Sequence, residues 1–128
     1  MKGFLGVEFF SSLNFDIQKA WTDQVYPMPV LNLTDLNSGW LSWSQGSVIL
    51  ADIGSLQMEF CTLSYLTKNP KYCKKVLPII DFIQSVSDAD GLCRPYINYK
   101  KANPYSRMTI GGLSDSYYEA ITLISSFF

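Results

Sequence analysis

The sequence predicts an all-α fold with about four helices and a small β-hairpin before the last helix. Apolar residues recur at spacings of three and four in several long segments, proline and glycine separate these segments, and two β-prone runs precede the last one. No repeat with a period of about 20–50 residues is present, so a regular solenoid is not predicted. The order helix, loop, helix, helix, hairpin, helix is the order that a slice of an α/α barrel would have.

The first predicted helix covers residues 7–21 and is followed by a loop over residues 22–45. The apolar face of this helix consists of Phe10, Leu13, Ile17 and Trp21. The loop is rich in proline, asparagine, serine and glycine, and Pro27 and Pro29 exclude a helix interior there. The letters Asn-Ser-Gly at 37–39 indicate a turn. Long ordered loops of this kind often carry function.

The second and third predicted helices cover residues 47–67 and 70–86. The apolar stripe of the second helix is formed by Ile49, Ile53, Leu56, Phe60, Leu63 and Leu66. Asn69 and Pro70 end it, and Pro70 suits the first turn of the next helix. The inward face of the third helix consists of Val76, Ile79, Ile80 and Ile83, and Pro78 favours a bend or an early end.

A hairpin and a fourth helix complete the predicted order. Asp90 and Gly91 indicate a turn, and the β-prone runs Arg94–Tyr99 and Arg107–Ile110 follow with Asn-Pro at 103–104 between them. We expect these runs to pair as a hairpin or an irregular extended pair. The fourth helix is predicted to start near Ser114 and to run toward the C-terminus.

Composition excludes several classes of function. The 128 residues are 48% hydrophobic and carry a net charge of −1, which is typical of a globular domain and gives no electrostatic case for nucleic-acid binding. There is no histidine, so Ser-His-Asp and Cys-His catalysis and the HExxH zinc motif are excluded within this chain. The basic cluster, which suits a solvated helix face or an anion site, consists of Lys68, Lys71, Lys74 and Lys75.

The cysteines and the apolar runs say less about compartment. Cys61, Cys73 and Cys93 lack metal-ligand spacing, and their odd number leaves at least one thiol unpaired within the chain. Burial as small apolar side chains is the favoured interpretation. The N-terminal apolar run is broken by Glu8, and no stretch reaches the about 18–20 apolar residues that span a bilayer. We therefore expect no membrane segment in this chain and a targeting segment outside it.

The second predicted helix carries a polar face with two carboxylates. Asp52, Ser55 and Glu59 follow at spacings of three and four, opposite the apolar stripe. Seven residues place the carboxylates about 10 Å apart along the axis. That separation is too large for a shared proton but would suit the two sides of a sugar ring. A solvated polar face remains the alternative interpretation.

Asp115 stands at the predicted start of the last helix. Gly111 and Gly112 allow a sharp turn, Ser114 or Asp115 is expected to cap the helix, and residues 116–119 have the capping-box pattern. The first-turn N–H groups and the macrodipole favour the ionised carboxylate. Asp115 is therefore either a structural helix residue or a base or charge stabiliser, and the two roles do not exclude each other.

Several motifs occur in an order and spacing that resemble a known enzyme family. They read YPMPVLNL at 26–33, GWLSW at 39–43, LAD at 50–52, QMEF at 57–60, LSYLT at 63–67, DGL at 90–92 and GLSDSYYEA at 112–120. Over residues 20–119 the sequence is similar to the class I α-1,2-mannosidases, glycoside hydrolase family 47. The resemblance implies one partial catalytic domain over residues 1–128, as a fragment of an (α/α)7 barrel.

The resemblance implies a calcium-dependent inverting hydrolase that trims terminal α-1,2-linked mannose from high-mannose N-glycans in the endoplasmic reticulum or Golgi lumen. It places Asp115 in the catalytic pocket and brings Asp52, one methylene shorter than the family's glutamate, to the substrate. Leu113 occupies a position that is arginine in endoplasmic-reticulum-type enzymes and leucine in Golgi-type ones, which favours the Golgi type.

The chain departs from the family pattern in two ways. No Phe-Glu-x-x-Ile-Arg segment, which carries the family's proposed acid, precedes Tyr26, and the further glutamates and the calcium-anchoring threonine of the family lie beyond the Asp-Ser-Tyr-Tyr element. We therefore expect a fragment that is inactive alone and lacks metal ligands of its own. The alternative function is a non-catalytic glycan-binding or helical interaction module derived from the same fold.

Overall fold

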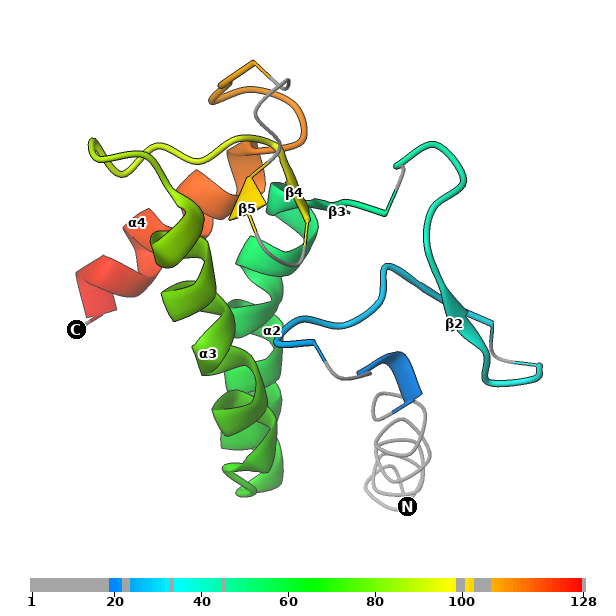
Figure 1. The fold of residues 1–128 in the computed structure, drawn as a ribbon. Helices are drawn as coiled ribbons and strands as arrows, with labels where there is room; N and C mark the ends of the chain where they lie inside the picture. The colour runs from blue at the N-terminus through cyan, green and yellow to red at the C-terminus, as the bar shows by residue number, and fades with distance from the viewer. Residues whose placement is uncertain are drawn as a thin grey trace.

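The computed structural model describes residues 19–21, 24–32, 34–44, 46–98, 101–102 and 107–127. Three long helices dominate this part of the chain (Figure 1): α2 (Leu50–Thr67), α3 (Lys71–Val86) and α4 (Asp115–Phe127). The short strands are β1 (Val30–Leu31), β2 (Ser38–Gly39), β3 (Val48–Ile49), β4 (Tyr96–Asn98) and β5 (Lys101–Ala102). The described region is thus mainly helical, as predicted.

Helices α2 and α3 form a helical hairpin, and α4 packs against the N-terminal half of α2 (Figure 1). Lys68 ends α2 in the left-handed region, at φ 54°, where its N–H reaches the carbonyls of Ser64 and Tyr65. Pro70 precedes α3, as predicted. Pro78 lies inside α3, which nevertheless continues to Val86, so the predicted early end does not occur.

The core lies where the three helices meet the small sheet. Its buried members are Tyr26, Val48, Leu50, Ile53, Val76, Ile79, Ile83, Cys93, Ile97 and Tyr117. Leu56 and Phe60 pack against this core, as the predicted stripe requires, but Leu66 is 64% exposed. The stripe therefore faces the core only along the first three turns of α2, because α4 does not extend beside its last turn.

Strands β3, β4 and β5 form an antiparallel sheet, which differs from the predicted hairpin. β4 pairs with β5 through Ile97 and Ala102, and on its other side with β3 through Val48 and Ile97. The predicted first run is thus confirmed at Tyr96–Asn98, but the second run, 107–110, is irregular. The strand that pairs with β4 lies instead at Lys101–Ala102.

The predicted loop contains a further hairpin. Val30 pairs with Gly39 and Leu31 with Ser38, so the predicted turn at 37–39 is wrong. The reversal instead lies before Asn37, where the Asp35 carboxylate accepts the Asn37 N–H at 3.1 Å. Residues 48–49 form a strand rather than the first turn of α2 because they pair with β4. Most of the predicted first helix, residues 7–18, lies outside the described residues; Lys19 and Ala20 are helical.

A disulfide joins the two helices of the hairpin. Cys61 of α2 and Cys73 of α3 are bonded, with their Cα atoms 4.2 Å apart. The expectation that these two residues are buried as free thiols is wrong. The turn at Lys68 folds α3 back along α2, so that the two sulfur atoms lie within disulfide-bonding distance. Cys93 is free and buried, as expected.

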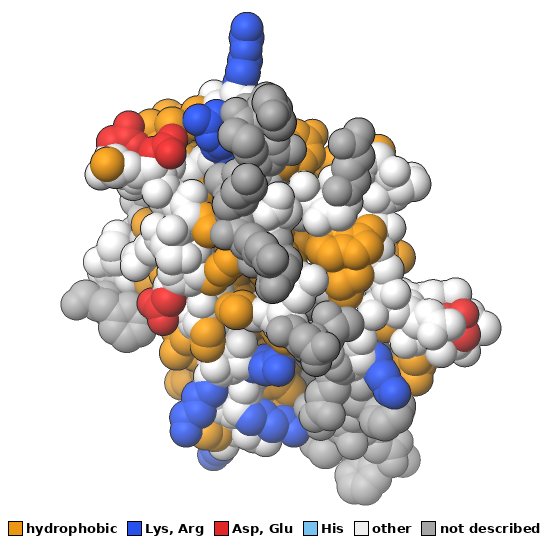
Figure 2. Space-filling model, in the orientation of Figure 1, with side chains coloured by type: hydrophobic (Ala, Val, Ile, Leu, Met, Phe, Trp, Pro, Cys, Tyr) orange, Lys and Arg blue, Asp and Glu red, His pale blue; other side chains and the backbone are white. Residues whose placement is uncertain are grey.

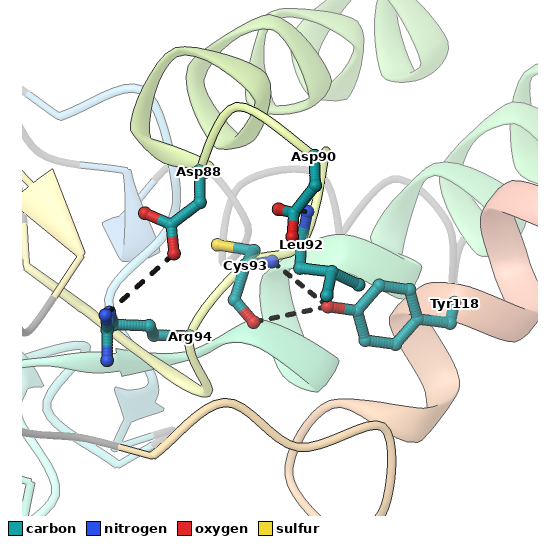
Figure 3. A network of polar contacts seen from close by, with 6 residues as sticks. All are labelled: Asp88, Asp90, Leu92, Cys93, Arg94 and Tyr118. Atoms are coloured by element: carbon teal, nitrogen blue, oxygen red, sulfur yellow. Dashed lines mark hydrogen bonds and ion pairs between the residues drawn. The ribbon is translucent and has the colours of Figure 1, made fainter.

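A polar latch ties α4 to the segment after α3 (Figure 3). The Tyr118 hydroxyl accepts the Cys93 N–H at 3.1 Å and donates to the Cys93 carbonyl at 3.2 Å. Asp90 accepts the Leu92 N–H, and Arg94 lies 3.9 Å from the Asp88 carboxylate. This network fixes the chain between α3 and β4 beside the helix that carries Asp115.

Candidate functional site

Asp52 lies in the first turn of α2 and points toward the proline-containing loop. It lines a hollow of 170 Å³ together with Pro27, Met28, Pro29, Val48, Ile53 and Leu56. The loop approaches because Tyr26 is buried in the core and the Met28 N–H donates to the Ala20 carbonyl at 2.8 Å. The predicted loop and the predicted carboxylate therefore meet.

Asp115 is the first residue of α4, and its side chain accepts one of the unpaired N–H groups of the first turn. Its Oδ1 accepts the Ser116 N–H at 3.0 Å, and its N–H donates to the Gly111 carbonyl at 3.1 Å. Ser114 is fully buried, but its hydroxyl oxygen has no hydrogen-bond partner among the described residues. Ser114 occupies the cap position, because its carbonyl accepts the first helical N–H groups, those of Tyr117 and Tyr118. Its hydroxyl makes no cap bond within the described residues, so the predicted side-chain cap is not formed there. The Asp115 carboxylate is exposed and accessible.

One backbone hydrogen bond brings the three predicted site residues to the same end of the helix pair. The Ala51 N–H donates to the Leu113 carbonyl at 3.0 Å, which joins the first turn of α2 to the turn before α4. Asp52 is the residue after Ala51, and Asp115 lies two residues after Leu113. Leu113 has φ 76°, a left-handed conformation that is uncommon for a leucine, and its side chain is 38% exposed.

The two carboxylates nevertheless line separate hollows. The hollow of Asp115 has a volume of 490 Å³ and is lined by Ile110, Asp115, Tyr118, Glu119, Thr122 and Leu123. Neither Asp52 nor Leu113 lines it. The structure thus brings Asp52, Leu113 and Asp115 to one end of the helix pair. Of the hollows lined by described residues, however, none contains both carboxylates.

Glu119 lies near Asp115, and the sequence pattern predicts for it only a place in a capping box. It lies one turn after Asp115 and lines the same hollow. The signal was present in the sequence, because residues four apart share one face of a helix. The capping-box pattern led to a different prediction, because the same residues predict that Glu119 has a purely structural role.

The environments of the acidic groups differ. Burial beside the proline loop raises the pKa of Asp52 above its usual range. Asp35, in the turn of the β1–β2 hairpin, has its pKa lowered by hydrogen bonds from the backbone and side chain of Asn37. Burial likewise raises the pKa of Tyr117 to about 12, so its hydroxyl stays protonated against α2. Asp52 is still exposed, so its desolvation is partial, and a partly desolvated carboxylate in a hollow is an environment found at functional sites.

The described residues do not by themselves provide a metal site. Within them, no group of three or more histidine, cysteine, aspartate or glutamate side chains lies close enough to hold a metal ion. Calcium prefers six to eight oxygen ligands, so Asp115 and Glu119 alone would not suffice.

Two further features bear on what the region contacts. An apolar groove of 320 Å³ runs between the three helices, lined by Gln57, Met58, Cys61, Thr62, Cys73, Leu77, Ile80, Leu123 and Ile124. Searched over the described part of the chain, the helices include none with the length and apolarity needed to cross a membrane.

Comparison with known proteins gives consistent matches. A family model described as glycosyl hydrolase family 47 matches residues 12–125. The mannosyl-oligosaccharide 1,2-alpha-mannosidase MNS1 of Arabidopsis thaliana is 44% identical over 103 residues, which cover 78% of this chain and 18% of that protein. Mannosyl-oligosaccharide 1,2-alpha-mannosidase IB of Homo sapiens is 43% identical over 84 residues, covering 65% of this chain and 13% of that protein.

A third relative shows the same pattern. Mannosyl-oligosaccharide 1,2-alpha-mannosidase IA of Sus scrofa is 35% identical over 101 residues, covering 77% of this chain and 15% of that protein. The chain thus spans less than a fifth of the length of each of these three relatives.

Proposed function

The chain belongs to glycosyl hydrolase family 47, and from this premise we propose that it forms one wall of an α-1,2-mannosidase site. The substrate would be terminal α-1,2-linked mannose of high-mannose N-glycans, in the lumen of the endoplasmic reticulum or Golgi. The observation that carries this proposal is the Ala51–Leu113 hydrogen bond, because it sets the carboxylates of α2 and α4 at one end of the helix pair.

Each carboxylate has a distinct role in this proposal. Asp115 is exposed in the first turn of a helix, where the macrodipole favours the anion, and it serves as a base or charge stabiliser. Asp52, partly desolvated beside the proline loop, contacts the sugar as an acceptor or, when protonated, as a donor. Leu113 offers an apolar contact to a sugar face.

Inverting hydrolysis requires two carboxyl groups about 6.5–9.5 Å apart with a water between them. Because Asp52 and Asp115 line separate hollows, the acid that opposes Asp115 would come from outside this wall. Calcium, which the resemblance implies, would also need ligands from outside the described residues. We therefore expect the chain alone to release mannose at a negligible rate.

A chimaera tests this proposal. Residues 20–119 replace the matching segment of the plant relative, and mannose release from a high-mannose N-glycan is measured. We expect the chimaera to be active, and Asp115→Asn to lower the rate by about 10²–10⁴-fold. The control is Asp81→Asn, an exposed aspartate on α3. An active chimaera that Asp115→Asn leaves unchanged contradicts the assignment.

A second function, glycan binding without hydrolysis, is favoured by the separate hollows of Asp52 and Asp115. In that case the complete chain would bind a high-mannose glycan in a calorimetric titration. Saturable binding by the chain, together with an inactive chimaera, would favour this function over the enzyme wall.

A further inference from the structure

The turn between α2 and α3 carries a concentration of positive charge beside exposed apolar side chains. We call this set the basic tip, and its members are Tyr65, Leu66, Lys68, Lys71, Lys74 and Lys75. Space-filling (Figure 2) shows lysine and arginine side chains gathered at the lower end of the molecule, where Figure 1 places the α2–α3 turn. The tip therefore lies at the closed end of the helical hairpin (Figure 1).

Packing holds the basic tip in one arrangement. Lys71, Lys74 and Lys75 follow at spacings of three and four on the outer side of α3, while Tyr72 and Val76 are buried on its inner side. The Cys61–Cys73 disulfide and a 2.8 Å hydrogen bond from the Cys73 N–H to the Ser64 hydroxyl oxygen fix the two helices together beneath it. The lysines are thus presented by a cross-linked scaffold.

The charge of the tip is not neutralised by the described residues. The ion pair that the structure gives within them joins Arg94 to Asp88, in the segment after α3. Within the described residues, no ion pair joins a lysine of the tip to Glu59 of α2 or to Asp81 of α3. The tip therefore calls for an anionic partner.

The aromatic contacts of the lysines add to the amphipathic character of the tip. The Lys71 ammonium lies 5.0 Å from the Tyr72 ring centre, and that of Lys75 lies 5.2 Å from the Trp21 ring centre. Such side chains bury their stems against apolar surface and keep the charge outward.

The exposed apolar side chains distinguish one kind of anionic partner. Tyr65 is 83% exposed and Leu66 64% exposed, although both are large and apolar. No basic-tip residue lines any of the three hollows described above. An acidic peptide would need a groove, whereas a tyrosine and a leucine among lysines suit the boundary between lipid headgroups and acyl chains.

We propose that the basic tip docks on an anionic lipid surface. The lysine ammonium groups lie among the headgroups, and Tyr65 and Leu66 enter the interface. This site is separate from the proposed glycan site, because Asp52 and Tyr65 lie in the first and last turns of α2, about 20 Å apart along its axis. A docked molecule therefore keeps the Asp52–Asp115 end away from the lipid.

Co-sedimentation of the complete chain with vesicles tests the proposal. Vesicles of phosphatidylcholine with about 30% phosphatidylserine are compared with pure phosphatidylcholine at low and high salt. We expect binding to the anionic vesicles alone, weakened by salt, and reduced about fivefold by Lys71→Gln or by Lys74→Gln. Leu66→Ser should also weaken it.

Matched controls are Arg107→Gln, an exposed cation outside the tip, and Ile110→Ser, whose side chain is 67% exposed against 64% for Leu66. Circular dichroism verifies that each variant is folded, and the salt dependence of the unmodified chain gives an answer without any variant. Binding that ignores salt and the lysine substitutions overturns the proposal. So does capture by polyglutamate without vesicle binding, which would identify an acidic protein partner instead.

Discussion

At the residue scale, Gly54 sets how closely α4 approaches α2. A Cβ built on Gly54 would overlap the Tyr117 ring and lie 2.9 Å from the Tyr117 Cβ. Both residues are buried, so neither helix has room to yield without repacking. The close crossing is what allows the Ala51–Leu113 hydrogen bond, and therefore the position of Asp115 beside the start of α2.

We predict that Gly54→Ala lowers the free energy of unfolding by about 1–3 kcal/mol, because overpacking outweighs the higher helix propensity of alanine. Urea denaturation followed by circular dichroism measures this. Gly39→Ala is the control, since a Cβ there meets nothing within 4 Å. Equal stability of the Gly54→Ala and unmodified chains would show that the helices do not cross as closely as described.

The pKa values of Asp52 and Asp35 should be shifted in opposite directions. Burial raises the pKa of Asp52 above its ordinary 3.8, and hydrogen bonds from Asn37 lower the pKa of Asp35. The folded state therefore binds the Asp52 proton more tightly than the unfolded state does, so the contribution of Asp52 to stability falls as pH rises from 3.8 through the raised pKa. Asp35 contributes stability that is lost as pH falls through its lowered pKa.

Carboxyl NMR titration checks both directions. In addition, Asp52→Asn should flatten the decline in stability above pH 3.8, whereas Asp35→Asn should remove a stabilising contribution at neutral pH. A pKa for Asp52 at or below 3.8 would mean that the proline loop does not desolvate it.

The sequence predicts some site residues and conceals others. Asp52 and Asp115 could be placed in first helical turns because spacing and glycine-rich turns mark helix starts. The left-handed Leu113 could not, since nothing in its letters distinguishes it from an extended leucine. Glu119 shares a hollow with Asp115 on an exposed face of α4. The local sequence pattern does not show which helix face stays exposed.

At the element scale, the Tyr118 latch joins α4 to the segment between α3 and β4. Its hydroxyl makes both a donated and an accepted hydrogen bond with Cys93, whose backbone is otherwise inside the core. Because Tyr118 also lines the hollow of Asp115, its hydrogen bonds to Cys93 hold one wall of that hollow in place.

Tyr118→Phe should lower stability by about 1–3 kcal/mol, since it leaves a buried N–H and carbonyl unpaired. Hydrogen exchange of the Cys93 amide, measured by NMR, should accelerate at the same time. Tyr65→Phe is the matched control, because that ring is 83% exposed. An unchanged exchange rate of the Cys93 amide in Tyr118→Phe would show that the Tyr118 hydroxyl does not bond the Cys93 backbone.

The Cys61–Cys73 disulfide closes a short loop around the α2–α3 turn, with 12 residues of sequence separation. Its removal in Cys61→Ser/Cys73→Ser should cost about 3 kcal/mol, which thermal unfolding measures. The denatured, unreduced chain should present one thiol, that of Cys93, and three after reduction. Reductant should not destabilise the double variant further. Three thiols before reduction would contradict the bond.

Helices were predictable where strands were not, for a physical reason. The bounds of α3 agree with the prediction within one residue, because proline and a 3.6-residue period mark it locally. The strands are two or three residues long and exist through pairing across the chain, as Ile97 does with both Val48 and Ala102. Pairing of that kind leaves no period in so short a run.

At the scale of the whole molecule, the three long helices of the described residues form a unit, and the proposed site residues Asp52, Leu113 and Asp115 lie at one end of it. Its tertiary contacts join α2 to α3 and α2 to α4, and an apolar groove remains open between the three helices. Met58, Leu77 and Leu123 in that groove are exposed. The chain matches less than a fifth of each of the relatives described, and such a groove is where a neighbouring helix would pack.

We propose above that the joined first turns of α2 and α4 form a wall of a mannose-binding site. The most direct measurement is a titration of the ¹⁵N-labelled chain with a high-mannose N-glycan, followed by amide chemical shifts. We expect saturable shifts centred on Asp52, Leu113 and Asp115, and none at Lys71 or Tyr65 in the basic tip. Saturable shifts that leave these three amides unmoved, or no shifts at millimolar glycan, would contradict it.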